Sequence, residues 1–204
     1  MARITRKESH AQTRERLVET AYRLFMADGY NATSLDKVAA EAGFSKGAVY
    51  SNFATKTELG LAVLDVLHLE RAMSLAAAVL EAETAEDRIA GFAKWADENI
   101  GDVGWGALEV EFATSNRNVP GVNNELASRR RLLTAALGDL LEQQATDLGL
   151  VLPMPAEDAA TQLLALGIGL GLQRAFDPEL PVTGIVDQLR SLLERSTPID
   201  PSGR

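Results

Sequence analysis

The residues best suited to contact another molecule gather between positions 45 and 56 of this 204-residue chain. Lys46, Tyr50 and Asn52 offer an ammonium group, a phenol hydroxyl and an amide, which are groups that hydrogen-bond phosphates and base edges. Gly47 has no side chain and permits a close backbone approach, and Lys56 adds a second cation. This pattern favours contact with nucleic acid.

The flanking sequence predicts two short helices joined by a tight turn. The first covers residues 35–42, with apolar residues on one face and Ser34 as its cap. Gly43 supplies the turn, and Ser45 caps a second helix over residues 46–53, whose first amides favour a nearby phosphate. This arrangement is typical of a helix-turn-helix, in which the second helix reads DNA.

The segment from Arg14 to Leu59 resembles the TetR (tetracycline-repressor-like) family of bacterial transcriptional regulators. The matching positions are Ala21, Leu24, Phe25, Gly29, Tyr30, Thr33, Ser34, Val38, Ala39, Ala42, Gly43, Ser45, Gly47, Tyr50, Phe53, Lys56 and Leu59. Asn52 departs from the family pattern, which usually has an aromatic residue or histidine there.

The resemblance implies an all-α fold with an N-terminal three-helix DNA-binding head and a C-terminal helical regulatory and dimerisation body. It implies DNA contacts by Thr33, Ser34, Ser45, Lys46, Gly47, Tyr50, Asn52 and Lys56. Lys46 and Asn52 are the candidates for base edges, whereas Tyr50, Thr33 and Lys56 are candidates for phosphate contacts. The expected domains are residues 1–56 for the head and residues 57–204 for the body.

Charge supports the same division, because residues 1–56 carry a formal charge of +3 and the remaining residues carry −12. Cysteine is absent and only two histidines occur, so no disulfide, thiolate metal site or histidine-rich metal site is expected. We find no catalytic triad in a motif context and no phosphate-binding loop, and we expect neither an enzyme nor a cofactor.

Helical periodicity continues through the body. Helices are predicted at residues 14–28, 35–42, 46–53, 57–80, 85–100, 106–115, 121–148, 157–176 and 185–195, with a frayed tail from residue 197. Gly167, Gly169 and Gly171 form a GxGxG pattern, but helical sequence continues on both sides, so a dinucleotide-binding loop is rejected.

The predicted helix at residues 157–176 is apolar nearly all round and should be buried on more than one side, and the last predicted helix carries apolar residues at helical spacing. The family resemblance implies that they pair with their symmetry mates in a homodimer, which would bind a palindromic double-stranded DNA operator. The predicted interface residues are Leu163, Gly167, Leu170, Gly171, Ile185, Leu189 and Leu192, and packing within one chain is the alternative.

Aromatic and methionine residues of the central helices suit an adaptable apolar pocket for a small-molecule effector. The candidates are Met73, Phe92, Trp95, Trp105, Glu109 and Phe112, although each could simply fill a core. Glu109 or Glu111 could serve as a polar anchor, or both could be solvated.

These features predict a ligand-responsive transcriptional regulator, a repressor in the first instance, that a largely apolar effector releases from DNA. The alternatives are a DNA-binding regulator without an effector and a helical scaffold for protein interactions. The N-terminus has no apolar core of signal-peptide length, and no stretch reaches ~18 apolar residues, so a cytoplasmic protein without membrane contact is expected.

Overall fold

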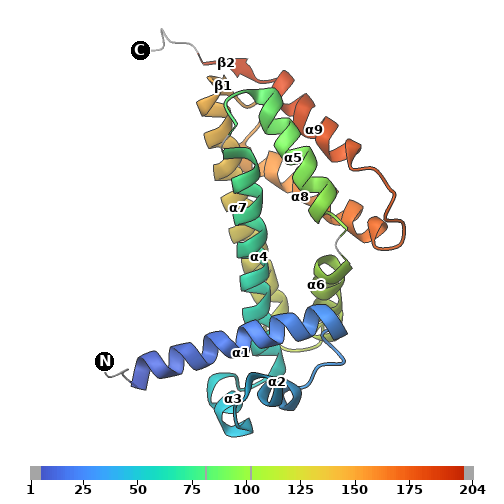
Figure 1. Ribbon diagram of the computed structural model, residues 1–204. Coiled ribbons are helices and arrows are strands. Elements are labelled where there is room, and N and C mark those ends of the chain that lie inside the picture. Colours follow the sequence, from blue (N-terminus) through green and yellow to red (C-terminus); the bar gives the residue numbers. More distant parts are fainter. Residues whose placement is uncertain (1–5, 81, 102, 200–204) are drawn as a thin grey trace. The chain divides into compact units, whose positions relative to one another are not determined.

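The computed structural model describes residues 6–80, 82–101 and 103–199, with the side chains of residues 6, 7, 103–105 and 107 outside the description. Within this part, the chain forms nine helices and one short pair of strands (Figure 1). In order they are α1 (Arg6–Asp28), α2 (Leu35–Ala42), α3 (Lys46–Asn52), α4 (Lys56–Leu80), α5 (Ala85–Asn99), α6 (Val103–Ser115), α7 (Val122–Asp147), β1 (Leu150–Val151), α8 (Ala156–Arg174), α9 (Thr183–Glu194) and β2 (Thr197–Pro198). The predicted all-α class is confirmed.

Most helix boundaries lie within a few residues of their predicted positions, and the differences have local reasons. Helix α1 begins at Arg6 rather than at residue 14, because residues 8–12 are exposed and leave no apolar stripe to detect. The tail is not frayed at its start, since Thr197 and Pro198 pair with Val151 and Leu150 in an antiparallel ladder. None of the helices described is long and apolar enough to cross a membrane.

The chain divides into two compact units. The first contains residues up to His68 together with Ala107–Asn123, and the second contains Leu69–Gly106 together with residues from Asn124 onward. The domain boundary predicted after residue 56 falls at the start of α4, and the compact units divide the same helix at His68.

In the first unit, α1 packs against both α2 and α3 (Figure 1). Leu17, Val38, Val49 and Phe53 are fully or almost fully buried and supply the shared core. Because α3 has only seven residues, two of these core side chains, Val49 within it and Phe53 at its end, hold it in place. The packing therefore determines which face of α3 remains outside.

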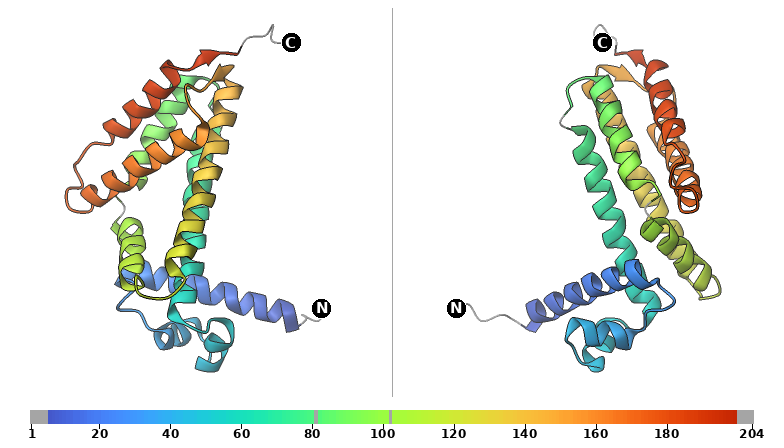
Figure 2. Two further views of the ribbon diagram at one scale, coloured as in Figure 1. Left: turned by 180° about the vertical axis from the view of Figure 1, so that it is seen from behind. Right: turned by 45° about the vertical axis from the view of Figure 1, so that its right-hand side comes forward.

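In the second unit, α9 packs against α5 and α8 (Figure 2). Gly167 and Gly171 lie inside α8, which confirms that the GxGxG pattern is not a nucleotide-binding loop. A Cβ atom on Gly167 would lie 3.4 Å from Ile185, and one on Gly171 would lie 3.9 Å from Ile100. Ile185 of α9 and Ile100 at the end of α5 therefore lie beside α8 at these two glycines.

Candidate nucleic-acid interface and effector cavity

The turn between α2 and α3 has the geometry that the sequence predicted. The Ser34 hydroxyl accepts a hydrogen bond from the Lys37 amide at 3.1 Å, and the Ser45 hydroxyl accepts one from the Ala48 amide at 3.2 Å. Gly43 ends α2 with φ of 72°, in the left-handed region that glycine enters without steric cost. Local residues therefore fix the angle between the two helices of the helix-turn-helix.

One side of α3 lies outside the core, and we call it the reading face: Ser45, Lys46, Gly47 and Tyr50. All four residues are exposed, and Tyr50 retains 54% of its accessible surface. A Cβ atom added to Gly47 would meet only the Ser45 hydroxyl, at an ordinary contact distance of 3.8 Å. This face offers a cation, two hydroxyls and an open backbone to a partner.

Lys46 is paired with Asp36 of α2, with 2.5 Å between its Nζ and the carboxylate. The hydrogen bond and the charge of Asp36 raise the pKa of Lys46. Both side chains are exposed, so water and salt screen the pair. Lys46 is therefore free to exchange Asp36 for a phosphate.

Lys56, at the start of α4, lies over the Tyr30 ring, with its Nζ 4.2 Å from the ring centroid. The ammonium also donates to the Asn31 carbonyl at 3.2 Å. Partial burial lowers the pKa of Lys56, opposed by the charge of Glu111. The cation is thus held in one position beside the first unit's surface.

Two predicted DNA contacts do not fit the structure. The Asn52 side chain is 9% exposed, and its Nδ2 donates to the Ala48 carbonyl of its own helix at 2.8 Å. Thr33 is 1% exposed, and its hydroxyl donates to the Gly29 carbonyl at 3.0 Å. Neither the Asn52 nor the Thr33 side chain therefore lies at the surface. Both side chains hydrogen-bond the backbone of their own segment instead.

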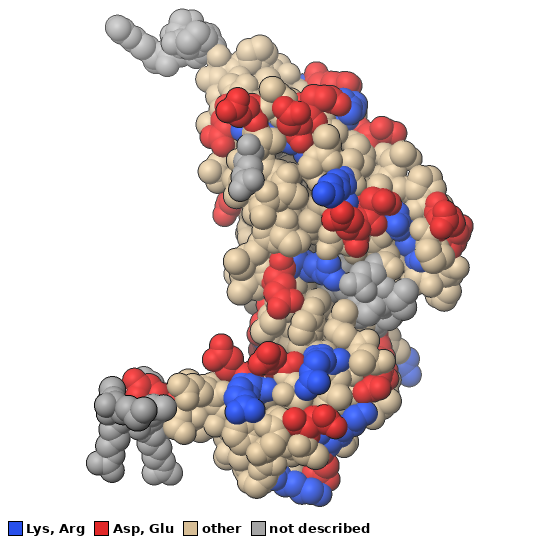
Figure 3. Space-filling model, in the orientation of Figure 1, with Lys and Arg blue, Asp and Glu red and all other residues tan. Residues whose placement is uncertain are grey.

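Charge on the first unit is mixed. Lys and Arg side chains alternate with Asp and Glu over the N-terminal helices in the view of Figure 3. Lys37 pairs with Asp28 at 2.9 Å, in the same way as Lys46 pairs with Asp36. The phosphates of a nucleic-acid partner must therefore displace these carboxylates before they can pair with the two lysines.

The two glutamates of α6 are partly buried, and neither is among the residues that line the cavity of the second unit. Glu111 accepts hydrogen bonds from the backbone amides of Tyr30 and Asn31, at 2.8 and 2.9 Å. Glu109 lies 3.4 Å from the Nε2 of His68. Both contacts belong to the first unit, so the expectation of a ligand contact at Glu109 is not met.

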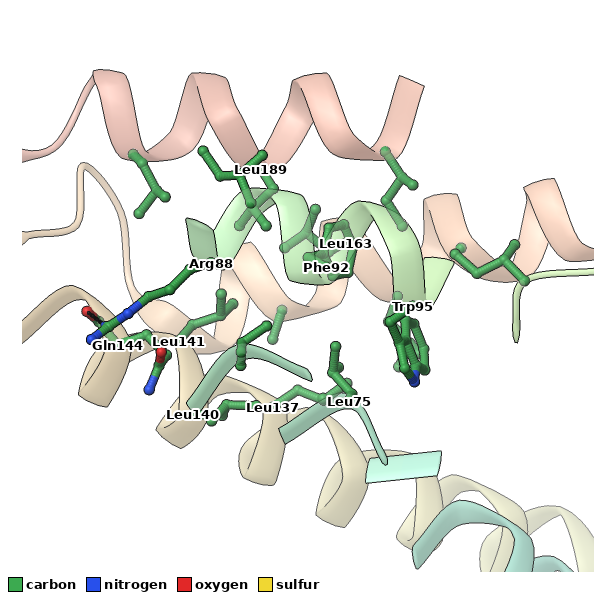
Figure 4. Close-up of a pocket in the computed structure, with 18 of the residues that line it drawn as sticks. Leu75, Arg88, Phe92, Trp95, Leu137, Leu140, Leu141, Gln144, Leu163 and Leu189 are labelled. Atoms are coloured by element: carbon green, nitrogen blue, oxygen red, sulfur yellow. Dashed lines mark hydrogen bonds between the residues drawn. The ribbon is translucent and has the colours of Figure 1, made fainter. Parts of the chain in front are cut away.

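The second unit holds a cavity of about 140 Å³ whose wall is almost wholly apolar. Phe92 and Trp95 line it, as predicted for an effector pocket. Figure 4 also labels six leucines of the wall: Leu75, Leu137, Leu140, Leu141, Leu163 and Leu189. Arg88 and Gln144 bring polar groups to one end of the cavity, and Trp95 lies at the other end (Figure 4).

The remaining effector candidates are not in that wall. Met73 is 64% exposed and does not line the cavity. Phe112 is fully buried in the first unit, with its ring centroid 5.1 Å from that of Tyr30. The side chain of Trp105 lies outside the described residues.

Sequence reasoning missed Arg88 and Gln144, although one signal was present. Gln144 continues the spacing of Leu137 and Leu141 along one face of α7, and Leu148 follows just after the helix ends. A polar residue inside an apolar stripe at helical spacing is a candidate for an inward-facing polar group.

The predicted dimer residues face the interior of their own chain. Ile185, Leu189 and Leu192 are 9% exposed or less, and they belong to the core of the second unit. Leu163, Gly167, Ile185 and Leu189 line the cavity, while Leu170 packs on the core and Gly171 is buried. The alternative of packing within one chain accounts for these positions.

Comparison with known proteins finds relatives of the helix-turn-helix segment. The model of the tetR family of bacterial regulatory proteins matches residues 17–63. A 64-residue segment is 42% identical to the HTH-type transcriptional regulator SrpR of Pseudomonas putida, covering 31% of this chain and 30% of SrpR. A 59-residue segment is 41% identical to the HTH-type transcriptional regulator AcrR of Shigella flexneri, covering 29% and 27%. The matched segments thus span less than a third of these curated relatives.

Solved structures extend the likeness to the whole fold. A TetR-family transcriptional regulator from Streptomyces coelicolor is 23% identical with a TM-score of 0.65, covering 90% of this chain and 95% of that one. A transcriptional regulator from Rhodococcus is 24% identical with a TM-score of 0.69, covering 90% and 97%. A protein from Saccharomonospora viridis in complex with choline is 19% identical with a TM-score of 0.64, covering 91% and 97%.

The matched residues 17–63 contain both helices of the helix-turn-helix and the whole reading face. The curated relatives are named as transcriptional regulators, which agrees with the expectation that the chain is not an enzyme. The helix-turn-helix segment of this chain, residues 17–63, thus matches the tetR family of bacterial regulatory proteins, and the fold of the chain resembles that of solved transcriptional regulators.

Proposed function

We propose that the protein is a DNA-binding transcriptional regulator of the bacterial cytoplasm, with a DNA-binding domain at residues 1–56 and a regulatory domain at residues 57–204. The observation that carries this proposal is the reading face of α3, where Lys46 and Tyr50 are exposed beside Gly47 while Val49 is fully buried behind them. A helix with one anchored face and one exposed polar face fits the major groove.

Direct DNA contacts are proposed for six of the eight predicted residues. They are Ser34, Ser45, Lys46, Gly47, Tyr50 and Lys56. Lys46 is the candidate for a base edge, whereas Tyr50 and Lys56 contact phosphates. Thr33 and Asn52 support the contacts from inside, because their hydrogen bonds hold the entry to α2 and the end of α3.

Operator selection from random or genomic DNA tests this proposal, followed by fluorescence anisotropy on the selected site. Lys46→Ala should lower the affinity for the selected site and relax its base preference, because a base-edge contact is lost. Lys94→Ala is the matched control, because Lys94 is an exposed lysine of α5 in the second unit. Equal losses in both variants, or a failure to select any site, contradict DNA reading by α3.

We also propose that the cavity of the second unit binds a small, largely apolar effector. Its apolar wall with two polar residues at one end supports this, since ligand sites are typically apolar with a few placed polar groups. Helix α4 carries Lys56 at its start and the cavity residues Leu75 and Val79 near its end. An effector that prefers one position of α4 therefore shifts the population that is competent for DNA.

A homodimer is proposed to use the outer face of α8, which differs from the predicted set. Leu166, Leu172 and Phe176 are exposed on this side, and Phe176 retains 90% of its surface. Ala165 and Gly169 recur with them at helical spacing, and an added Cβ on Gly169 would meet nothing within 4 Å. Small residues between large apolar ones let a partner helix approach closely. Sedimentation of Leu172→Glu tests this surface, because a dimer that persists in the variant contradicts it.

The proposed role is repression, with release of the operator when the effector binds. Operator affinity measured with and without ligands found by thermal-shift screening separates this role from that of a regulator without an effector. Ligands that stabilise the protein and weaken operator binding support the first role. Ligands that stabilise the protein but leave operator affinity unchanged support the second.

A further inference from the structure

Gln144 of α7 is a buried amide without a partner. Its side chain lines the cavity and the residue is only 9% exposed. Neither its Oε1 nor its Nε2 has a hydrogen-bond partner in the part of the chain that the structure describes. A buried amide in this state costs free energy, because it loses its bonds to water and gains none. Both atoms are buried within the wall at this end of the cavity, and a turn of the side chain would bring this acceptor and donor to a complementary group of a ligand.

Arg88 lies at the same end but is already engaged. Its Nε donates to the Ala82 carbonyl at 2.9 Å, and its Nη1 donates to the Gln144 backbone carbonyl at 2.8 Å. These bonds fix the guanidinium against the end of α7 and leave the side-chain amide of Gln144 unpaired. The remaining wall is leucine, isoleucine, phenylalanine and tryptophan for the most part, without a carboxylate among the lining residues.

The wall chemistry separates the possible ligand head groups. At the end of the cavity where Gln144 lies, a cationic head meets the positive charge of Arg88 and no carboxylate, so that end does not suit a quaternary ammonium such as the choline in the Saccharomonospora viridis structure. A carboxylate head can accept from Nε2 but faces the Oε1 of Gln144 with like partial charge. A neutral amide pairs with both atoms at once, because it has a donor beside an acceptor.

We propose that the effector is a neutral, largely apolar molecule with one amide-type head group, which Gln144 holds through two hydrogen bonds. The proposal rests on the effector role of the cavity proposed above. The volume of about 140 Å³ has room for about five water molecules at the density of the liquid, so the apolar part has the size of a medium-length alkyl chain or a substituted ring. Displacement of water from this wall supplies affinity, and Gln144 supplies selectivity.

Calorimetric titration with three matched probes tests the proposal: octanamide, octanoate and octylammonium. Octanamide should bind at least about tenfold more tightly than the other two, which is the scale of losing a buried hydrogen bond. Gln144→Leu should reduce octanamide binding by about the same factor and raise the melting temperature of the free protein, because it removes the unpaired groups. Gln143→Leu is the control, since Gln143 is the exposed neighbour on α7.

The outcomes distinguish a failure of the amide assignment from a failure of the proposed effector role. Preference for octanoate, with loss of binding in Arg88→Met, overturns the amide assignment and leaves the effector cavity in place. Octanamide binding that Gln144→Leu does not weaken overturns the role of Gln144, as does binding of none of the three probes. Octanamide binding that depends on Gln144 but leaves operator affinity unchanged upholds the inference and contradicts the ligand response.

Discussion

The carboxylate of Glu111 ties α6 to the connection between α1 and α2, and its removal should destabilise the first unit. Oε2 accepts from the Tyr30 amide at 2.8 Å and Oε1 accepts from the Asn31 amide at 2.9 Å. These amides follow Gly29, which ends α1 with φ of 89°, so no helical carbonyl is available to them. The carboxylate therefore replaces the helix as their acceptor.

The size of the effect follows from burial. A hydrogen bond to a charged group contributes about 1.5–3 kcal/mol, and Tyr30 is 4% exposed whereas Asn31 is exposed. Water can replace Glu111 at Asn31 but not readily at Tyr30. Glu111→Ala should thus lower the free energy of unfolding by about 3 kcal/mol. For a chain of this size, the melting temperature should fall by roughly 6–12 °C.

Thermal and urea unfolding followed by circular dichroism measure this change. Glu19→Ala is the matched control, because Glu19 is exposed on α1. Glu111→Gln should fall between the two, since the amide keeps one acceptor and turns a donor toward the other N–H group. If Glu111→Ala unfolds at the same temperature as the control, the tie contributes nothing and the reasoning is wrong.

Three further predictions concern the head. Asp36→Asn should strengthen binding to any DNA and steepen its salt dependence, because it removes the carboxylate that pairs with Lys46 at 2.5 Å; unchanged affinity in anisotropy contradicts this. The pKa of Lys56 is lowered by burial, so the folded state binds fewer protons than the unfolded state between that pKa and the ordinary value near 10.4. The stability of the wild type relative to Lys56→Met should therefore rise with pH across this window in urea titrations, and a difference that is flat in pH refutes it. Gly60→Ala should lower stability by about 1–3 kcal/mol, because the new Cβ would lie 2.5 Å from the buried ring of Phe112; a variant as stable as the wild type contradicts the close packing.

Features that depend on neighbouring residues were predictable from the sequence. Ser34 and Ser45 cap their helices and Gly43 adopts the left-handed turn, because each interaction spans no more than a few residues. The same local rules placed most of the remaining helix boundaries. The family resemblance, which rests on residues between Arg14 and Leu59, agrees with the matched residues 17–63.

Sequence alone determined the helices, the helix-turn-helix and its resemblance to the tetR family, because these depend on short-range periodicity, caps and a local motif. Tertiary structure decided which side of each helix is buried. It turned Asn52 inward, it brought Glu111 to the amide of Tyr30 across 81 positions, and it enclosed Gln144 while leaving Gln143 exposed. These outcomes depend on how distant helices pack, and residue type alone does not distinguish Gln144 from Gln143.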